Sequence, residues 1–210
     1  MSGDLSISLC GDDTLHVRIE DEVRRNLVCQ RLLEAGVWRE VVATLDGVTV
    51  QFDPIRQLPA NAVAFLREAL DVPLDQEATA PLEIDIPVHY GGQFGPDLAC
   101  VAKQLGVSEE DVIRRHTAYR HRVQMIGFTP GFAYLSSDGD GLDIPRLATP
   151  RPRIAAGSVG VMGGQSGLYA LAGPGGWPII GRTDAQLFQD NMDPPCALSL
   201  GMVVRFVRHD

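Results

Sequence analysis

The hydrophobic and polar positions of the first 70 residues follow a regular order of short strands and helices. Apolar runs of strand length predict strands, and apolar residues at helical spacing predict helices. Gly36 marks the end of the first helix, and Asp46-Gly47 marks a hairpin, because both residues tolerate a left-handed backbone. The predicted elements, in order, are residues 5–9, 14–19, 22–35, 37–45, 48–52 and 60–70.

This order is β-β-α-β-β-α, and its natural packing places two helices on one face of an antiparallel sheet. The periodicity is lost over residues 71–81, which are rich in proline and acidic residues and therefore predict a linker. We expect a small α+β domain over residues 1–80 and a second domain over residues 83–210.

The second domain begins with an alternating strand at residues 83–90 and two short helices, and then loses helical periodicity. Pro96 opens the first helix and Gly106 closes it, whereas Ser108 and Asp111 form a capping box for the second. Beyond them, β-prone pieces lie between glycines and prolines, which is typical of a small β-barrel or sandwich with long loops. These pieces are residues 119–128, 158–162, 168–171, 178–180 and 202–207.

Composition is that of an ordinary globular protein, because 45% of the 210 residues are hydrophobic and 21% are charged. The net charge of −9 opposes binding to a nucleic-acid backbone. No apolar stretch approaches the roughly 20 residues that a membrane helix needs, and the first residues lack the pattern of a signal peptide. The cysteines stand far apart and predict reduced thiols in a cytoplasmic protein. They are Cys10, Cys29, Cys100 and Cys196.

Several common catalytic motifs are absent from the sequence. Arginine supplies 17 of the 18 basic residues, and without a GxxxxGK[ST] loop we do not expect a P-loop ATP site in this chain. The histidines and cysteines lack metal-site spacing, and the acidic turn at residues 136–143 lacks the glycine and glutamate of a calcium loop. Neither Ser158 nor Ser166 fits the GxSxG pattern of a serine hydrolase.

The richest chemistry lies in residues 125–183, where Gly- and Pro-rich loops carry aromatic residues and arginines. The glycines and prolines build tight turns. The side chains suit a small carboxylate, carbonyl or phosphate, and they suit a protein interface equally well. His116 shares a helix face with Val112 and Ile113, so it is either a core histidine or a proton carrier at the edge of a cleft.

Six motifs, in order along the chain, carry a resemblance to a known family. They are PVHYGGQFGPDL (87–98), DVIRRHT (111–117), MIGFTPGF-YL (125–135), PRLATPR (145–151), AGSVGVMGGQSGLY (156–169) and PGGWPIIGRT (174–183). Over nearly its whole length the sequence resembles the B subunits of 5-oxoprolinases, a family also called Kip-type kinase inhibitor or allophanate hydrolase subunit 1. The resemblance implies an α+β N-terminal domain followed by a mainly-β, cyclophilin-like barrel.

The resemblance also implies a function shared between polypeptides. Such proteins work with a barrel-shaped C subunit, which is allophanate hydrolase subunit 2-like, and with an A subunit of the LamB/YcsF type. Together they form an ATP-dependent hydrolase that opens 5-oxoproline to glutamate, so we expect ATP on a partner and no activity from this chain alone. Two alternatives stay open. One is a non-catalytic inhibitor of a histidine kinase, and the other is a carboxyltransferase-like or allophanate hydrolase role in urea or amide metabolism.

For the 5-oxoprolinase reaction, the sequence suggests a set of site residues and no metal. Arg153 and Arg182 are expected to bind the anionic group, His116 or Tyr134 to carry a proton, and Gln165 to orient the substrate. The expected substrate-binding residues add aromatic rings and backbone N–H groups. They are Phe128, Phe132, Gly163, Gly164, Gly175, Gly176 and Trp177.

Overall fold

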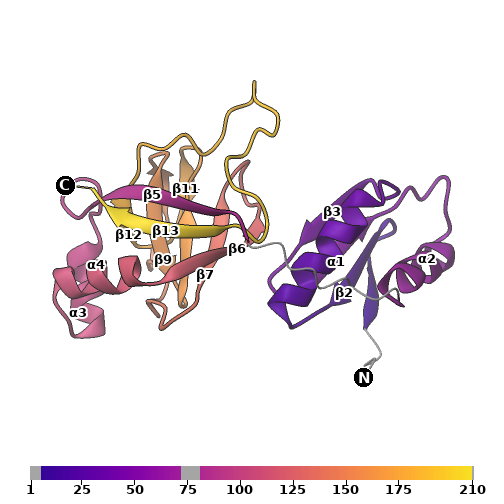
Figure 1. The fold of residues 1–210 in the computed structure, drawn as a ribbon, viewed down its shortest axis with the longest axis horizontal. Coiled ribbons are helices and arrows are strands. Elements are labelled where there is room, and N and C mark those ends of the chain that lie inside the picture. The colour runs from indigo at the N-terminus through magenta and orange to yellow at the C-terminus, as the bar shows by residue number, and fades with distance from the viewer. Residues whose placement is uncertain (1–5, 72–80, 210) are drawn as a thin grey trace. The chain divides into compact units, whose positions relative to one another are not determined.

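The computed structural model describes residues 6–71 and 81–209, and the chain divides into two compact units between Ala80 and Pro81 (Figure 1). Most of the predicted linker, residues 72–80, lies outside the described residues. Within the described part, no helix combines the length and apolar character needed to cross a bilayer.

The N-terminal unit confirms the predicted β-β-α-β-β-α order. Its sheet is antiparallel with strand order β1-β2-β4-β3. The elements are β1 (Ile7–Cys10), β2 (Thr14–Arg18), α1 (Glu22–Glu34), β3 (Glu40–Ala43), β4 (Gly47–Gln51) and α2 (Pro59–Asp71).

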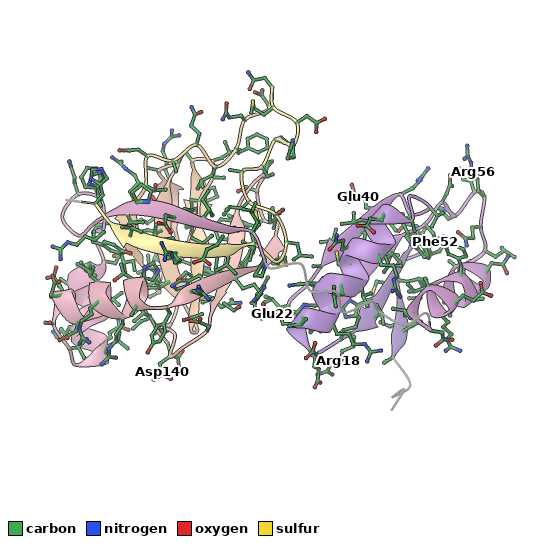
Figure 2. The ribbon with its side chains drawn as sticks, viewed as in Figure 1. Arg18, Glu22, Glu40, Phe52, Arg56 and Asp140 are labelled. Carbon is green, nitrogen blue, oxygen red and sulfur yellow. The ribbon has the colours of Figure 1, made fainter. Side chains whose placement is uncertain are left out.

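Buried apolar residues alternate with more exposed residues along the central strands β2 and β4, and the buried residues form the core of this unit. Leu15 and Val17 of β2 and Val48 and Val50 of β4 are fully buried, while charged side chains such as Arg18 extend into solvent (Figure 2). Helix α1 packs against β3 and β4.

The hairpin at Asp46-Gly47 is present, but the predicted reason for its glycine is wrong. Gly47 does not have a left-handed φ. A Cβ atom at this position would instead lie 2.1 Å from the Val17 carbonyl oxygen, so the glycine is required by close approach of the neighbouring strand.

The C-terminal unit is a closed seven-stranded barrel, which confirms the predicted fold class. Its strand order is β10-β7-β6-β13-β5-β12-β9, and all described pairs are antiparallel except β13 with β5. The strands are β5 (Glu83–Tyr90), β6 (Arg120–Ile126), β7 (Ala133–Ser137), β9 (Ser158–Met162), β10 (Gln165–Leu168), β12 (Ile179–Arg182) and β13 (Val203–Arg208). A separate two-stranded sheet pairs β8 (Arg151–Ile154) with β11 (Gly173–Gly175).

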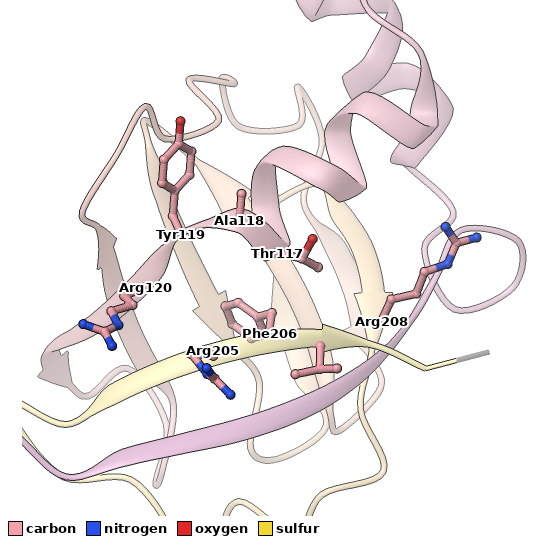
Figure 3. Close-up of a pocket in the computed structure, with 8 residues that line it drawn as sticks. Thr117, Ala118, Tyr119, Arg120, Arg205, Phe206 and Arg208 are labelled. Carbon is pink, nitrogen blue, oxygen red and sulfur yellow. The ribbon is translucent and has the colours of Figure 1, made fainter.

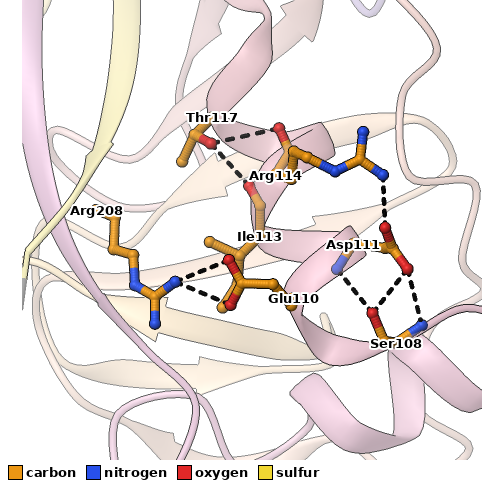
Figure 4. A network of polar contacts seen from close by, with 7 residues as sticks. All are labelled: Ser108, Glu110, Asp111, Ile113, Arg114, Thr117 and Arg208. Atoms are coloured by element: carbon orange, nitrogen blue, oxygen red, sulfur yellow. Dashed lines mark hydrogen bonds and ion pairs between the residues drawn. The ribbon is translucent and has the colours of Figure 1, made fainter.

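Helices α3 (Leu98–Leu105) and α4 (Glu109–Ala118) lie together beside the barrel (Figure 1). Gly106 ends α3 with a left-handed φ of 68°, and Ser108 and Asp111 form the predicted capping box of α4. Hydrogen bonds from Ser108 lower the pKa of Asp111 to about 2. Arg208 of β13 binds both carboxylate oxygens of Glu110 at 2.9 Å, which links α4 to the barrel (Figure 4).

Candidate functional site

The candidate site lies on the outer face of the barrel, opposite the main core. Ala133 and Leu135 of β7 belong to the interior core, so Tyr134 between them faces outward. Met162 and Gln165 are a cross-strand pair that follows the same alternation, because Val161 is an interior residue. Three neighbouring strands, β7, β10 and β9, therefore present polar and aromatic side chains on one surface.

Beside Tyr134, three buried aromatic rings form a second hydrophobic cluster: Phe132 and Tyr169 are 2% exposed and Trp177 is 3% exposed. Of the aromatic residues predicted to bind substrate, Phe132 and Trp177 are thus buried, whereas Phe128 is exposed. The Phe132 ring lies 4.7 Å from Tyr134, 4.9 Å from Tyr169 and 6.0 Å from Trp177, in edge-to-face geometry. Phe128 meets Phe132 at 5.6 Å. These separations are typical of favourable aromatic pairs. The predicted aromatic site residues are therefore assembled into one cluster.

Two glycines, Gly167 and Gly175, lie directly against these rings. A Cβ atom on Gly167 would lie 2.9 Å from both Phe132 and Trp177, and one on Gly175 would lie 2.4 Å from the Tyr169 hydroxyl. The glycine-rich motifs thus serve ring packing as well as turns.

The polar part of the site, which we call the Tyr134 face, consists of Tyr134, Gln165, Gln124, Met162 and Arg146. Gln165 Nε2 donates to Gln124 Oε1 at 2.8 Å, and Arg146 Nε lies 3.1 Å from Met162 Sδ. Burial raises the pKa of Tyr134, and the charge of Arg146 opposes that rise. Among the described residues, no carboxylate pairs with Arg146. The face therefore combines a neutral phenol with an uncompensated cation.

Two of the four glycines whose N–H groups were expected to line a pocket, Gly163 and Gly164, use those groups within the chain. Gly163 donates its N–H to the Ile144 carbonyl at 2.9 Å, and Gly164 donates to Leu142 at 3.3 Å. The carbonyl of Gly176 accepts from Leu147 N–H at 2.8 Å. These hydrogen bonds hold residues 142–147 against the barrel and so position Arg146.

An ion pair that sequence reasoning missed anchors the outer sheet. The buried carboxylate of Asp97 accepts two hydrogen bonds from Arg151 at 2.7 Å each and a third from Ile179 N–H at 2.7 Å. Asp97 precedes α3, Arg151 begins β8 and Ile179 begins β12, so one carboxylate joins three elements.

Among the described residues, neither arginine predicted to bind an anion has a hydrogen bond, ion pair or ring contact with the Tyr134 face. Arg182 stacks on the Phe94 ring at 4.5 Å, and its strand partner is His89. Arg153 is exposed on β8, and its side chain has no hydrogen bond or ion pair within residues 6–71 and 81–209.

His116 lies on α4, and its side chain is only 2% exposed. Its Nδ1 is 2.7 Å from the Tyr90 hydroxyl, and its Nε2 is 3.0 Å from Ser166 Oγ. Burial, reinforced by the nearby His121, lowers the pKa of His116 well below its ordinary value. The cavity beside it has a volume of about 10 Å³, which is enough for about one water molecule. His116 therefore occupies a core position with both ring nitrogens satisfied.

A larger groove of about 530 Å³ runs along β13 beside the end of α4 (Figure 3). Its arginines are already paired: Arg205 binds Asp85 at 2.7 and 2.8 Å, and Arg120 lies 3.4 Å from Glu83. Because nearby acids compensate these charges, the groove is a poorer anion site than the Tyr134 face.

The structure thus places Tyr134 and Gln165 on one face, whereas His116 is buried and, among the described residues, neither Arg153 nor Arg182 has a side-chain contact with that face. Sequence reasoning missed Arg146 and Gln124, although Arg146 stands in the quoted PRLATPR motif. In the described residues, no group of three or more His, Cys, Asp or Glu side chains is arranged to hold a metal ion.

The sequence matches one family model and is similar to 5-oxoprolinase B subunits from several bacteria. Residues 5–198 match the family described as carboxyltransferase domain, subdomain C and D. The chain is 41% identical to the 5-oxoprolinase B subunit of Escherichia coli O157:H7, covering 86% of this chain and 82% of that protein. It is 48% identical to the 5-oxoprolinase B subunit of Bacillus subtilis (strain 168), covering 77% of this chain and 65% of that protein.

Solved structures share the fold. TTHA0988 is 31% identical with a TM-score of 0.80 over 94% of this chain and 40% of its own. The conserved uncharacterized protein PH0987 from Pyrococcus horikoshii is 34% identical with a TM-score of 0.59, covering 98% of both chains. Urea amidolyase of K. lactis, 16% identical with a TM-score of 0.80, covers 98% of this chain and 15% of its own. By its sequence and its fold, the chain belongs to the carboxyltransferase subdomain C and D family that includes the 5-oxoprolinase B subunits.

Proposed function

We propose that this chain is the B subunit of a heteromeric, ATP-dependent 5-oxoprolinase that opens the lactam ring of 5-oxoproline to give glutamate in the cytoplasm. The observation that carries the proposal is the 41% identity to a 5-oxoprolinase B subunit over 82% of its length. A carboxyltransferase role has support from the family description and from likeness of fold to a urea amidolyase at 16% identity. We do not propose it, because the relatives at 41% and 48% identity are 5-oxoprolinase B subunits and a shared fold does not fix function.

The open Tyr134 face supports an active site shared with a partner, which we propose to be the C subunit, with the A subunit completing the complex. Tyr134 and Gln165 lie on the outside of the barrel, and the cavity beside the buried His116 is far too small for 5-oxoproline. A catalytic site must exclude water around the reacting atoms. We therefore place the second wall of the site on another polypeptide.

Opening the lactam breaks the bond between the carbonyl carbon and the ring nitrogen. Water supplies the oxygen that the carbonyl carbon gains to become the glutamate side-chain carboxylate, and the nitrogen must gain a proton. Tyr134 is the proton donor that we propose, because it faces outward between the interior residues Ala133 and Leu135 and a phenol is protonated at neutral pH. The nearby Arg146 stabilises the tyrosinate that forms or binds the substrate carboxylate. Gln165, held by Gln124, orients the amide. In this scheme His116 positions Ser166 within the barrel wall and does not touch substrate.

ATP, when bound on a partner, supplies the phosphoryl group that activates the lactam carbonyl. The glycine turn of this chain does not fit a phosphate cradle, since the N–H groups of Gly163 and Gly164 are engaged by backbone carbonyls. We accordingly assign no phosphate contact to this turn.

Omission from a reconstituted complex tests the proposal. The purified A and C subunits would be assayed for ATP-dependent glutamate formation from 5-oxoproline, with and without this chain. We expect product only when all three polypeptides are present. Equal product formation without the chain would refute the assignment, and product from this chain alone would refute the shared site.

A further inference from the structure

Phe128 combines two unusual properties at the start of the loop between β6 and β7. It is the one non-glycine residue with a left-handed φ, 69°, among the described residues. Its side chain is nevertheless 62% exposed, so burial does not compensate for the conformation. A Cβ atom in this region contacts the following carbonyl, which makes the conformation unfavourable for a bulky residue. Such an outlier points to a functional constraint.

Gly127, directly before Phe128, has the opposite combination of backbone conformation and side chain. Gly127 has no left-handed φ, and a Cβ atom there would meet nothing within 4 Å. Local preference would thus favour glycine at position 128 and a side chain at position 127, the reverse of this sequence. Because Gly127 has no side chain, its backbone has open space around it next to the exposed ring of Phe128.

Backbone hydrogen bonds fix the loop in this shape. Gly127 N–H donates to the Phe132 carbonyl at 3.1 Å, and Phe132 N–H donates to the Thr129 carbonyl at 3.0 Å. Ring contacts then connect the loop to the site, because Phe128 packs on Phe132 and Phe132 packs on Tyr134. The exposed ring therefore stands at the margin of the Tyr134 face on a rigid support.

We propose that Phe128 is a specificity-determining residue that recognises the ring of a cyclic amide substrate on the Tyr134 face. The substrate ring stacks on Phe128, and the bare backbone of Gly127 permits its close approach. A flat, partly apolar ring suits an aromatic surface, while Arg146 serves an attached carboxylate. The inference rests on the proposed function for its substrate class and adds the residue that reads the ring.

The variants Phe128→Gly and Phe128→Tyr test this role in the reconstituted complex with 5-oxoproline. Phe128→Gly removes the ring and the unfavourable backbone conformation together, so we expect Tm to be unchanged or higher while KM rises about tenfold. Phe128→Tyr retains the ring and should keep KM near that of the wild type. Met192→Gly, which removes a side chain 55% exposed in the loop between β12 and β13, is the matched control and should leave KM unchanged.

Three results would overturn the inference. Unchanged KM for Phe128→Gly with a lower Tm would make the ring structural. Loss of complex assembly in size-exclusion chromatography, with Tm unchanged, would make it a contact between the polypeptides of the complex. Both results, obtained with an active wild-type complex, leave the proposed function standing. An inactive wild-type complex would refute the proposed function and, with it, the substrate class on which the inference rests.

Discussion

Two buried histidines at the base of α4 make the stability of the C-terminal unit depend on pH. Burial lowers the pKa values of both His116 and His121, whose rings lie 4.9 Å apart. The unfolded chain then binds more protons than the folded chain at pH values below about 6.5, the ordinary pKa of histidine. The free energy of unfolding is therefore independent of the protonation of these histidines above about pH 6.5. As the pH decreases below that value, it decreases by about 1.4 kcal/mol per pH unit for each histidine that titrates only on unfolding.

Urea unfolding between pH 5 and pH 7.5 measures this effect. We expect the free energy of unfolding of His116→Gln to decrease less steeply at low pH than that of the wild type. The exposed variant His209→Gln should show the same dependence on pH as the wild type. Identical slopes for all three proteins would show that His116 accepts a proton in the folded state.

Arg146 is predicted to act through its charge beside Tyr134. Arg146→Gln removes the cation that opposes the raised pKa of the tyrosine, so that pKa should rise further. In the reconstituted complex, we expect kcat to fall about a hundredfold, the loss typical of one transition-state contact. Arg67→Gln, an exposed arginine of α2, is the control. A kcat loss of the same size in both variants would exclude a specific role for Arg146.

At the scale of elements, the Asp97–Arg151 pair should hold the β8–β11 sheet over the aromatic cluster. Asp97→Asn leaves Arg151 without its carboxylate partner, and we expect a loss of roughly 3 kcal/mol in the free energy of unfolding. The exposed pair Asp85–Arg205 has similar hydrogen-bond lengths, so Asp85→Asn is a matched control with an expected loss below about 1 kcal/mol. Equal losses in urea unfolding would contradict the anchoring role.

The packing of Gly167 against the aromatic cluster gives a second prediction at this scale. In Gly167→Ala the new methyl group meets the rings of Phe132 and Trp177 at about 2.9 Å, so the rings must move. Overpacking of this kind costs about 1–3 kcal/mol, and the near-UV circular dichroism of the aromatic residues should change. Gly173→Ala, at a site with nothing within 4 Å of the new methyl group, should change neither property. An unperturbed near-UV spectrum in Gly167→Ala would argue against this packing.

Elements with strong local signals were predictable from sequence, whereas elements that depend on pairing were not. The capping box at Ser108 and the left-handed Gly106 follow from local chemistry and are confirmed. The strand expected at residues 168–171 is instead β10 (Gln165–Leu168). Gln, Ser and Gly have weak strand preference, and pairing with β7 and β9 decides the outcome.

At the scale of the whole molecule, the sequence indicated the region of the candidate site more accurately than it indicated the individual residues of that site. Tyr134 and Gln165 share the outer face because strands separated in sequence pair in the barrel. Contacts such as Arg182 on Phe94 or Arg151 on Asp97 join positions more than 50 residues apart, and no local pattern reports them. His116 was expected to be either a core residue or a proton carrier, and its burial favours the first role.

We propose that this chain supplies the proton donor of a site shared between polypeptides. The most direct test is the kcat for glutamate formation by the complex reconstituted with Tyr134→Phe, after size-exclusion chromatography has established assembly and Tm has established folding. We predict a kcat lower by about 10²–10⁴-fold, the contribution of one general acid. A kcat within twofold of the wild type in a folded, assembled complex would contradict the claim.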